Sequence, residues 1–547
     1  MEKLKPKLFS VMKTYSKQQL IKDIIAGIIV AIIALPLSIA LGLASGVSPS
    51  QGIYTAIIAG FIISFLGGSR VQISGPTAAF ATIVASIVAR NGMDGLIVAT
   101  ILAGIILIVM GLFKMGSLIK YIPYTITTGF TTGIALTILI GQLKDFFGMT
   151  FPNTPIETVE KMEAFIHNSS TVNWQAAVVG IVCLIVLIVW PKINNKIPGS
   201  LIAVIVGVVL VKSFQMEVNT IGSLYEISNK LPAFSMPNIN ITIIKNVLPD
   251  AFTIAILAGI ESLLSCVVSD GMVGSRHRSN MELVAQGVGN IGSALFGGIP
   301  ATGAIARTAA NVKNGGRTPI AGMVHSVTLV LILVILMPYA ALIPMPTIAA
   351  ILFMVAYNMS EWRVFLDLVK TSPKSDITVL IVTFILTVVF DLVVAIEAGI
   401  ILAAFLFLKR MADVTHVEEW KYIEQMEEQD DPENISLKRV PDNTLVYEVV
   451  GPMFFAATNK LMNIPTDKSI NAIILRMRGV PALDATALRT LIKMYKKCQK
   501  NEVTLILSHV QNQPKSVMEK SGFVSQIGHE NFCNNIDEAL KRAELIG

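Results

Sequence analysis

The sequence predicts a mainly α-helical, polytopic membrane protein that ends in a small α/β domain. Hydrophobic residues make up 53% of the 547 residues and charged residues only 15%, whereas a soluble chain carries about 25% charged residues. Apolar runs long enough to cross a bilayer recur from Ile24 to Leu408. After Arg410 the composition becomes charged and strand-like. We therefore expect most of the chain to lie in a lipid bilayer.

Residues 1–22 are basic, and the first apolar run follows them directly. The run from Ile24 to Leu43 is longer than the apolar part of a signal peptide, and further spans follow it. We expect this run to remain as a membrane span, with residues 1–22 in the cytoplasm.

Hydropathy predicts about fourteen transmembrane segments, two of them only half-length. The segments of the first half are 24–46, 51–68, 76–90, 95–113, 119–147, 173–190 and 197–213. Those of the second half are 245–270, 281–297, 303–312, 318–338, 343–360, 375–391 and 392–409.

Basic loop residues fall on one side of this arrangement. Besides the N-terminal lysines they are Arg70, Lys114, Lys120, Lys192, Lys196, Arg276, Arg278, Lys313, Arg317, Arg363, Lys370, Lys374, Lys409 and Arg410. The opposite loops are poorer in Lys and Arg, and loop 150–172 carries Glu157, Glu160 and Glu163. The positive-inside rule therefore places both termini in the cytoplasm of a multi-pass protein of the cell membrane, plasma or inner.

The two halves predict an inverted repeat. Seven segments lie in residues 23–213, a nearly neutral external linker covers 214–244, and seven more segments lie in 245–410. An odd number of spans per half forces the halves into opposite orientations. The third segment of each half is the short one.

The remaining residues predict a linker plus an edge over 411–439 and a small domain over 440–547. Strand-like runs alternate with helical ones, which is typical of an α/β domain. The strands are Leu445–Val450, Ala472–Met477 and Val503–Ser508, and the helices are Thr486–Lys500, Lys515–Lys520 and Ile536–Glu544. Because the domain follows an inner terminus, we expect it in the cytoplasm.

Several function classes find no support. The four cysteines show no paired spacing, and the six histidines are scattered, so we expect no disulfide framework and no resident metal or other cofactor. No phosphate-binding Gly-x-x-x-x-Gly-Lys-Ser/Thr loop and no catalytic constellation is visible, so we expect no enzyme. The net charge of +6 reflects membrane topology rather than nucleic-acid binding.

Two short stretches at corresponding places in the halves are the strongest indication of a binding site. They are Ser74-Gly75-Pro76-Thr77-Ala78-Ala79 and Gly298-Ile299-Pro300-Ala301-Thr302-Gly303-Ala304. Such a pair indicates broken helices whose N-terminal amides face a central site, where anions bind readily. The predicted amide donors are those near Thr77, Ala78, Ala79, Ala304, Ile305 and Ala306. The alternative is that these small residues only permit tight helix packing.

Two ionisable residues stand out inside the predicted spans. Arg307 lies one turn into the second half-helix, and an intramembrane arginine usually faces a polar pathway. The alternatives are a structural role, paired with an acid or with carbonyl groups, and a position nearer the cytoplasmic interface. Glu261 lies deep in the eighth span, with Ser265 on the same helix face. Glu261 would carry a proton or help to bind sodium, and its alternative role is an ion pair with Arg307.

Motifs of one known family run along nearly the whole chain. They include Leu35-Pro36-Leu37, Gly52-Ile53-Tyr54-Thr55, Glu261-Ser262-Leu263-Leu264-Ser265, Asp270-Gly271-Met272, Arg276-His277-Arg278-Ser279-Asn280-Met281-Glu282-Leu283, Phe296-Gly297-Gly298-Ile299-Pro300 and, in the tail, Val480-Pro481-Ala482-Leu483-Asp484-Ala485-Thr486. Together they resemble the SulP family of anion transporters with a C-terminal STAS domain. The resemblance implies a core domain and a gate domain built from the seven-plus-seven repeat, a homodimer, and secondary active or exchange transport of small anions.

The resemblance also implies roles for single residues. Relatives place a coupling-ion acid and a hydroxyl in the span of Glu261 and Ser265, and Thr302 is a further candidate for the coupling ion. Some relatives carry an arginine at the place of Arg307, which adds positive potential to the anion site. Many eukaryotic relatives have Pro-Gln where this chain has Pro36-Leu37, and Leu37 cannot hydrogen-bond an anion. Thr486 matches a position that related signalling domains phosphorylate, and Asp484 has the alternative role of capping the helix.

We therefore expect a secondary active transporter of small inorganic anions, sulfate foremost, that couples anion movement to H+ or Na+. The rivals are a bicarbonate or C4-dicarboxylate transporter, an anion channel or exchanger on the same fold, and a membrane-tethered STAS signalling protein. A tether needs neither the broken helices nor Glu261 and Arg307, so the signalling hypothesis is the weakest of these.

Overall fold

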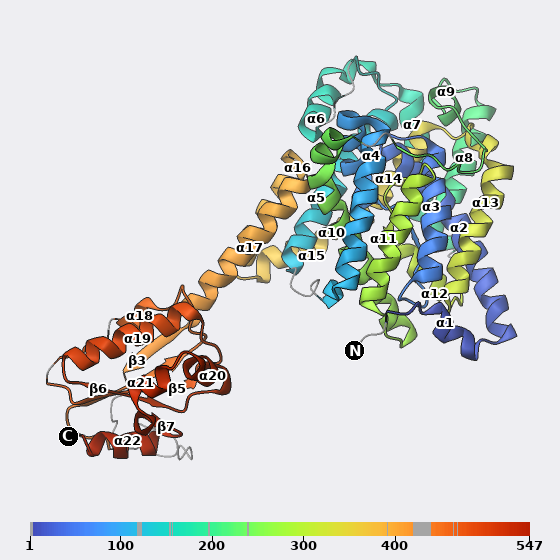
Figure 1. The fold of residues 1–547 in the computed structure, drawn as a ribbon. Coiled ribbons are helices and arrows are strands. Elements are labelled where there is room, and N and C mark those ends of the chain that lie inside the picture. The colour runs from blue at the N-terminus through green and yellow to red at the C-terminus, as the bar shows by residue number, and fades with distance from the viewer. Residues whose placement is uncertain are drawn as a thin grey trace. The chain divides into compact units, whose positions relative to one another are not determined.

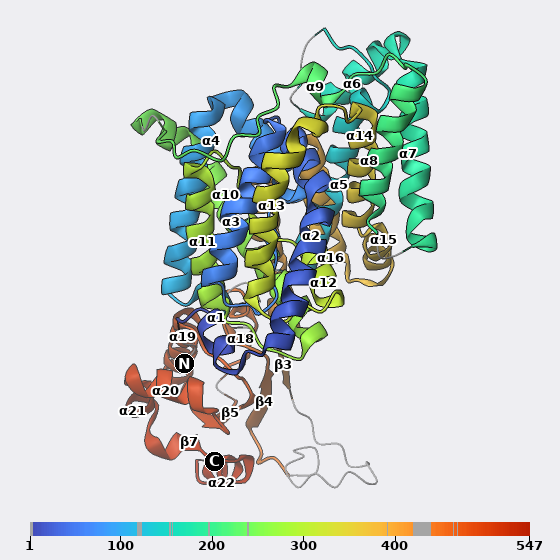
Figure 2. The same cartoon turned by 90° about the vertical axis from the view of Figure 1, so that its right-hand side faces the viewer.

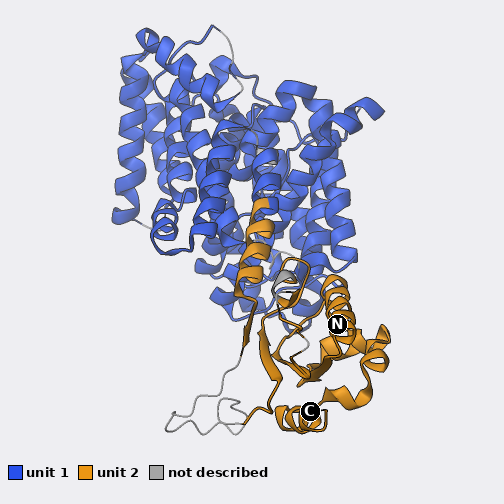
Figure 3. Ribbon diagram, turned by 90° about the vertical axis from the view of Figure 1, so that its left-hand side faces the viewer, with its two compact units in different colours: residues 1–401 blue, residues 402–547 orange. Residues whose placement is uncertain are grey.

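The computed structural model describes residues 4–117, 123–152, 155, 157–194, 197–237, 240–390, 392–419, 439–462, 464–467 and 469–546. The chain forms two compact units, residues 1–401 and 402–547, coloured separately in Figure 3. Of the predicted loop and linker residues, Lys120, Lys196 and 420–438 lie outside the described residues.

The first unit is helical, and its first half runs from α1 to α9. The elements are α1 (Leu8–Val11), η1 (Met12–Thr14), α2 (Lys17–Ala44), α3 (Pro49–Leu66), β1 (Ser74–Gly75), η2 (Ala78–Phe80), α4 (Ala81–Leu112), α5 (Tyr124–Phe146), α6 (Thr158–His167), η4 (Ser169–Thr171), α7 (Trp174–Ile193), α8 (Gly199–Ser213) and α9 (Ile221–Leu224). Its second half runs from α10 (Ile241–Val273) through α11 (Ser279–Leu295), β2 (Thr302–Gly303), α12 (Ile305–Lys313), α13 (Pro319–Ala340), α14 (Met345–Met359), α15 (Trp362–Thr371) and α16 (Lys374–Val389) to α17 (Leu392–Val414).

These helices follow the predicted segments closely. Seven of the described helices are long and apolar enough to cross a bilayer on their own, so the count of fourteen spans stays a prediction. The segments predicted at 76–90 and 95–113 join as η2 and α4, with a break at Gly92, whose φ of 65° is left-handed. Several shorter helices were not predicted, among them α6 and the amphipathic α15.

The helices of the first unit pack in two groups, each drawn from both halves of the chain. Figures 1 and 2 show α4, α10 and α11 side by side, and α2, α3, α12 and α13 pack with them. The second group contains α5, α7, α8, α14 and α16. This grouping matches the division into a core and a gate that the family resemblance implies.

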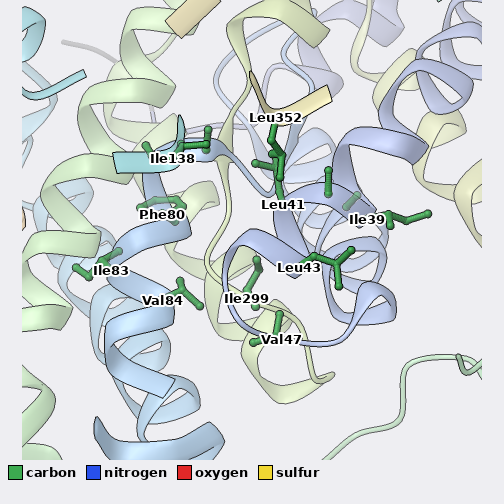
Figure 4. Close-up of a cluster of buried hydrophobic side chains, with 14 of the residues drawn as sticks. Ile39, Leu41, Leu43, Val47, Phe80, Ile83, Val84, Ile138, Ile299 and Leu352 are labelled. Carbon is green, nitrogen blue, oxygen red and sulfur yellow. The ribbon is translucent and has the colours of Figure 1, made fainter. Parts of the chain in front are cut away.

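Buried apolar side chains fill the space within and between these groups. Figure 4 shows Ile39 and Leu41 of α2, Phe80 of η2, Ile138 of α5 and Leu352 of α14 in one cluster. Elements far apart in the sequence therefore share one core.

Close backbone approach between α2 and α3 depends on Gly52. A Cβ at this position would collide with the carbonyl oxygen of Ser38. We expect Gly52→Ala to lower the stability of the protein by about 1–3 kcal/mol, because an added methyl overpacks a tight contact. The measurement is thermal unfolding in detergent. Gly141→Ala on α5, where an added Cβ meets nothing within 4 Å, should leave the unfolding temperature unchanged or raise it, and equal losses in both variants would contradict this packing account.

The second unit holds a five-stranded sheet in the order β3-β4-β5-β6-β7, in which only β3 and β4 pair antiparallel. The strands are β3 (His416–Glu419), β4 (Thr444–Val450), β5 (Ala472–Gly479), β6 (Thr504–Ser508) and β7 (Phe532–Cys533). The helices are α18 (Asn459–Met462), α19 (Ala485–Lys500), α20 (Asn512–Lys520), α21 (Phe523–Ile527) and α22 (Ile536–Glu544). Separate apolar clusters form on the two faces of the sheet, one under α19 and one under α22.

The predicted strands and helices of the tail are present, and β7, α18 and α21 are additional. Residues 411–439 were predicted as a linker plus an edge; α17 continues to Val414, and His416–Glu419 form the edge strand β3. A charged edge strand lacks the apolar alternation that marks a strand in sequence, and charge on an edge strand discourages pairing with another chain.

Candidate functional site

The two broken segments meet in the first unit. β1 pairs antiparallel with β2, with Ser74 opposite Gly303 and Gly75 opposite Thr302. The amide of Ala304 extends this ladder by donating to the carbonyl of Ile73 at 2.9 Å. The amide of Ile73 in turn donates to the hydroxyl of Thr308, 3.0 Å away on α12. Residues more than two hundred positions apart are therefore held together by backbone hydrogen bonds, as the central prediction requires.

Each strand leads directly into a helix. Thr77 is extended, and η2 then begins at Ala78; Ala304 is extended, and α12 begins at Ile305. The first amides of a helix have no partner within the helix, so Ala78, Ala79, Ile305 and Ala306 each lie where a free donor is expected. Because the strands are antiparallel, the two helices leave the pair in opposite directions. Their positive dipole ends consequently face the same region.

The prediction for the amide of Ala304 is wrong. The amide of Ala304 was expected to face an anion, but it donates to Ile73. The sequence places Ala304 at the start of an apolar run, and only the strand pairing shows that its N–H belongs to the ladder. Side-chain exposure also differs along the two segments, because Ala78 and Ala79 are buried whereas Ile305 is 44% exposed.

Arg307 lies between the two segments. It is buried, and its Nη2 donates to the carbonyl oxygen of Pro76 at 3.0 Å. Its Nη1 has no hydrogen-bond partner in the described structure, and it faces Gly75, where an added Cβ would lie 2.6 Å away. The guanidinium thus ties α12 to the end of β1, and the NH2 group of Nη1 remains to donate. The pairing with a carbonyl that the sequence left open is present.

Glu261 of α10 lies beside the first broken segment. Its Oε2 accepts a hydrogen bond from Oγ1 of Thr77 at 3.0 Å. None of the ion pairs described for the chain joins Glu261 to Arg307, so the alternative of a structural ion pair finds no support. The carboxylate of Glu261 is therefore held by Thr77, the residue directly before η2.

The two predicted hydroxyls hold the segments against α10. Thr302 donates to the carbonyl of Ala258 at 3.0 Å, and Ser265 donates to the hydroxyl of Thr308 at 3.3 Å. Both side chains are buried. Thr302 thus contacts the helix that carries Glu261 and Ser265, and each of the two hydroxyls has a partner of its own.

A buried carboxylate that no sequence pattern singled out lies next to this pair. Glu282 of α11 accepts hydrogen bonds from residues that directly precede β1. It appeared in the sequence only as part of a family motif. The signal that was available was an acidic residue at the start of an apolar segment, which is expensive to bury without partners.

In the second unit, Asp484 caps α19. Its carboxylate accepts from the amide of Ala487 at 2.8 Å and from that of Phe455 at 3.0 Å, which confirms the capping alternative. Thr486 is exposed in the first turn of the same helix. Its phosphorylation stays a prediction, which mass spectrometry of the native protein tests.

No group of three potential metal-ligating His, Cys, Asp or Glu residues occurs in the described part of the chain. The four cysteines are free and buried. Burial raises the pKa of Cys498 to about 11, so this thiol is protonated and unreactive at neutral pH.

Comparison with known proteins gives consistent matches along the chain. Residues 20–383 match the Sulfate permease family, and residues 435–539 match the STAS domain. The chain is 38% identical over 538 residues to "Putative sulfate transporter YvdB" of Bacillus subtilis, with 96% of this chain and 98% of that protein covered. It is 30% identical over 516 residues to the bicarbonate transporter BicA of a Synechocystis species, with 91% and 89% covered.

Solved structures agree. The murine Slc26a9 anion transporter in the inward-facing state gives a TM-score of 0.88 at 19% identity, covering 99% of this chain and 94% of that one, which shows a shared fold. The transmembrane domain of cyanobacterial BicA gives a TM-score of 0.62 at 28% identity, covering 71% of this chain and 98% of that one. These relatives are transporters and not enzymes, and they confirm the predicted helical fold with an α/β tail. Since the first match alone covers well over half of its residues, the chain belongs to the sulfate permease (SulP) family and carries a C-terminal STAS domain.

Proposed function

We propose that this multi-pass membrane protein is a secondary active transporter that moves small inorganic anions, sulfate foremost, by alternating access. The observation that carries the proposal is the β1–β2 pair, which brings the N-terminal ends of η2 and α12 to one place. Free amides of Ala78, Ala79, Ile305 and Ala306 would bind the anion there, and backbone amides suit a tetrahedral oxyanion. Arg307 would add a positive charge and the free NH2 group of Nη1.

The coupling ion would act through Glu261. A proton or Na+ on this carboxylate changes the hydrogen bond that Thr77 donates to it, and Thr77 immediately precedes the amides that would bind the anion. Binding of the cation would thereby change the affinity of the site for the anion, as linkage requires of any coupling between two ligands. Ser265 and Thr302 would fix α10 against both segments while this happens.

An exposed stripe of α10 would line the route to the site. Glu261 is half-buried, and Leu264, Val268 and Met272 on the following turns are exposed. On the second segment, Ile305 and Ala306 are exposed as well. Movement of the core group of helices against the gate group would then open this route on one side at a time. We further propose a homodimer in the cell membrane, with both termini in the cytoplasm.

Bicarbonate is the second candidate substrate. One relative at 30% identity is a bicarbonate transporter, and Leu37, half-buried on α2, offers no hydrogen bond to the larger oxyanion. A planar anion with fewer acceptor oxygens needs fewer donors.

The test is flux of the purified protein in liposomes. The panel contains sulfate, bicarbonate, fumarate and chloride, each with and without imposed proton or sodium gradients. Saturable, gradient-driven sulfate uptake would support the proposal. Saturable, gradient-driven uptake of bicarbonate alone would make bicarbonate, and not sulfate, the substrate. A passive conductance without saturation would overturn the transporter proposal in favour of a channel.

A further inference from the structure

The buried carboxylate of Glu282 has a complete set of neutral donors. Its Oε2 accepts from the amides of Gly68 and Ser69 at 2.8 and 3.1 Å. Its Oε1 accepts from Nε2 of Gln72 at 2.7 Å and from Nε2 of Gln286 at 3.0 Å. The carboxylate is fully buried. Four N–H donors satisfy it without a basic side chain among these partners, and such an arrangement holds its surroundings tightly.

These partners lie in the segment that leads into the anion site. Residues 67–73 connect α3 to β1, and Glu282 holds both the start of this segment and Gln72 near its end. The backbone contact is close, because a Cβ at Gly68 would collide with the carbonyl of Arg278 at the start of α11. The amide of Arg278 also donates to the carbonyl of Gly68 at 3.0 Å. The segment is therefore fixed to α11 through its backbone and through Glu282.

Gln72 connects this fixed segment to the second broken segment. Its Oε1 accepts from the thiol of Cys266 on α10 at 2.9 Å, so the orientation of the amide is set on both sides. Its side chain lies against Gly303 of β2, where an added Cβ would collide with it. Gln286 contacts β1 in a similar way, donating to the hydroxyl of Ser74 at 3.3 Å. Both strands of the pair thus contact an amide that Glu282 orients.

We infer that Glu282 is a positioning residue for the anion site: by orienting Gln72 and Gln286 it sets the register and spacing of the β1–β2 pair and hence the affinity for the transported anion. The inference rests on the proposed function. Glu282 itself does not touch the anion. It acts through residues that determine where the helix N-terminal amides lie.

The substitution Glu282→Gln isolates this role. The new amide can still accept from Gly68 and Ser69 through its oxygen, but its NH2 group faces the NH2 groups of Gln72 and Gln286. Gln72 relieves this conflict by turning its amide, which breaks the bond from Cys266 and alters its contact with Gly303. We expect the KM for anion uptake to rise at least about tenfold, while the maximal rate per correctly folded protein changes less.

A paired substitution provides the rescue. Combining Glu282→Gln with Gln72→Glu exchanges the carboxylate and the amide, so that the NH2 group at 282 donates to the carboxylate at 72. The thiol of Cys266 keeps its acceptor. We expect this double variant to recover most of the lost affinity, which a role limited to overall stability would not produce.

The experiment measures KM and maximal rate in liposomes together with the unfolding temperature. Asp250→Asn is the matched control, because Asp250 is a buried carboxylate on another helix, α10, where it pairs with Arg90 at 3.1 Å. It should lower stability without changing KM. A Glu282→Gln protein with the parent KM, or a double variant without recovery, overturns the inference. If the parent protein transports no anion of the panel, the proposed function fails instead.

Discussion

Arg307→Ala should strongly weaken the binding of the transported anion. The change removes the buried guanidinium, whose Nη2 donates to the carbonyl of Pro76 and whose unpaired Nη1 lies beside Gly75. A hydrogen bond from a charged donor contributes about 1.5–3 kcal/mol, and about 1.4 kcal/mol is a tenfold change in binding. We therefore expect the KM for sulfate to rise by about 10- to 100-fold, measured as initial uptake rates into liposomes.

Two further variants separate charge from geometry at this position. Arg307→Lys keeps the positive charge but loses the planar fork, so it should recover only part of the affinity. Arg90→Ala removes the same charge from a half-exposed position at the far end of the first half-helix, and its KM should stay close to that of the parent. Parent-like KM in Arg307→Ala, in protein with a normal unfolding temperature, would exclude Arg307 from the site.

Glu261→Gln should abolish the dependence of uptake on an imposed cation gradient. Glutamine can still accept the hydrogen bond from Thr77, so the local packing is kept, but it neither binds a proton nor offers a negative charge to sodium. Accumulation against the anion gradient should fall to the passive level, while exchange of anions at equal concentrations continues. The measurement is sulfate accumulation with a proton gradient, with a sodium gradient and with neither.

Thr77→Val is the matched control for Glu261→Gln, because it removes the same hydrogen bond from the other side and leaves the acid. This variant should keep its dependence on the cation gradient, with a changed KM. Unchanged dependence on both gradients in Glu261→Gln would refute coupling through this residue.

Patterns in the sequence that depend on local chemistry predicted most of the fold. Helix length, hydropathy and loop charge located the long helices because burial in lipid demands an uninterrupted apolar run. The amphipathic α15 was missed, because its ten residues are too short and too polar to resemble a span. An edge was predicted within 411–439 but without bounds, because the residues of β3, His416–Glu419, lack an apolar face.

At the candidate site, too, local patterns predicted some features and not others. Proline and glycine beside small residues predicted where the two helices break, and the inverted repeat predicted that the breaks meet. The sequence could not predict hydrogen-bond partners across more than two hundred residues. For this reason it assigned the amide of Ala304 to the anion instead of to Ile73, and it left Glu282 without a role. Pairing of this kind depends on tertiary contacts that no local pattern records.

The convergence of two helix N-termini on one anion is the claim on which the rest depends, and a crystal structure of the protein soaked with selenate, a tetrahedral analogue of sulfate with an anomalous scatterer, tests it most directly. The account predicts an anomalous peak within hydrogen-bond distance of the amides of Ala79 and Ile305, on the side of the β1–β2 pair that Arg307 faces. A selenate peak elsewhere in the first unit, with those amides bonded to other groups of the protein, would contradict it.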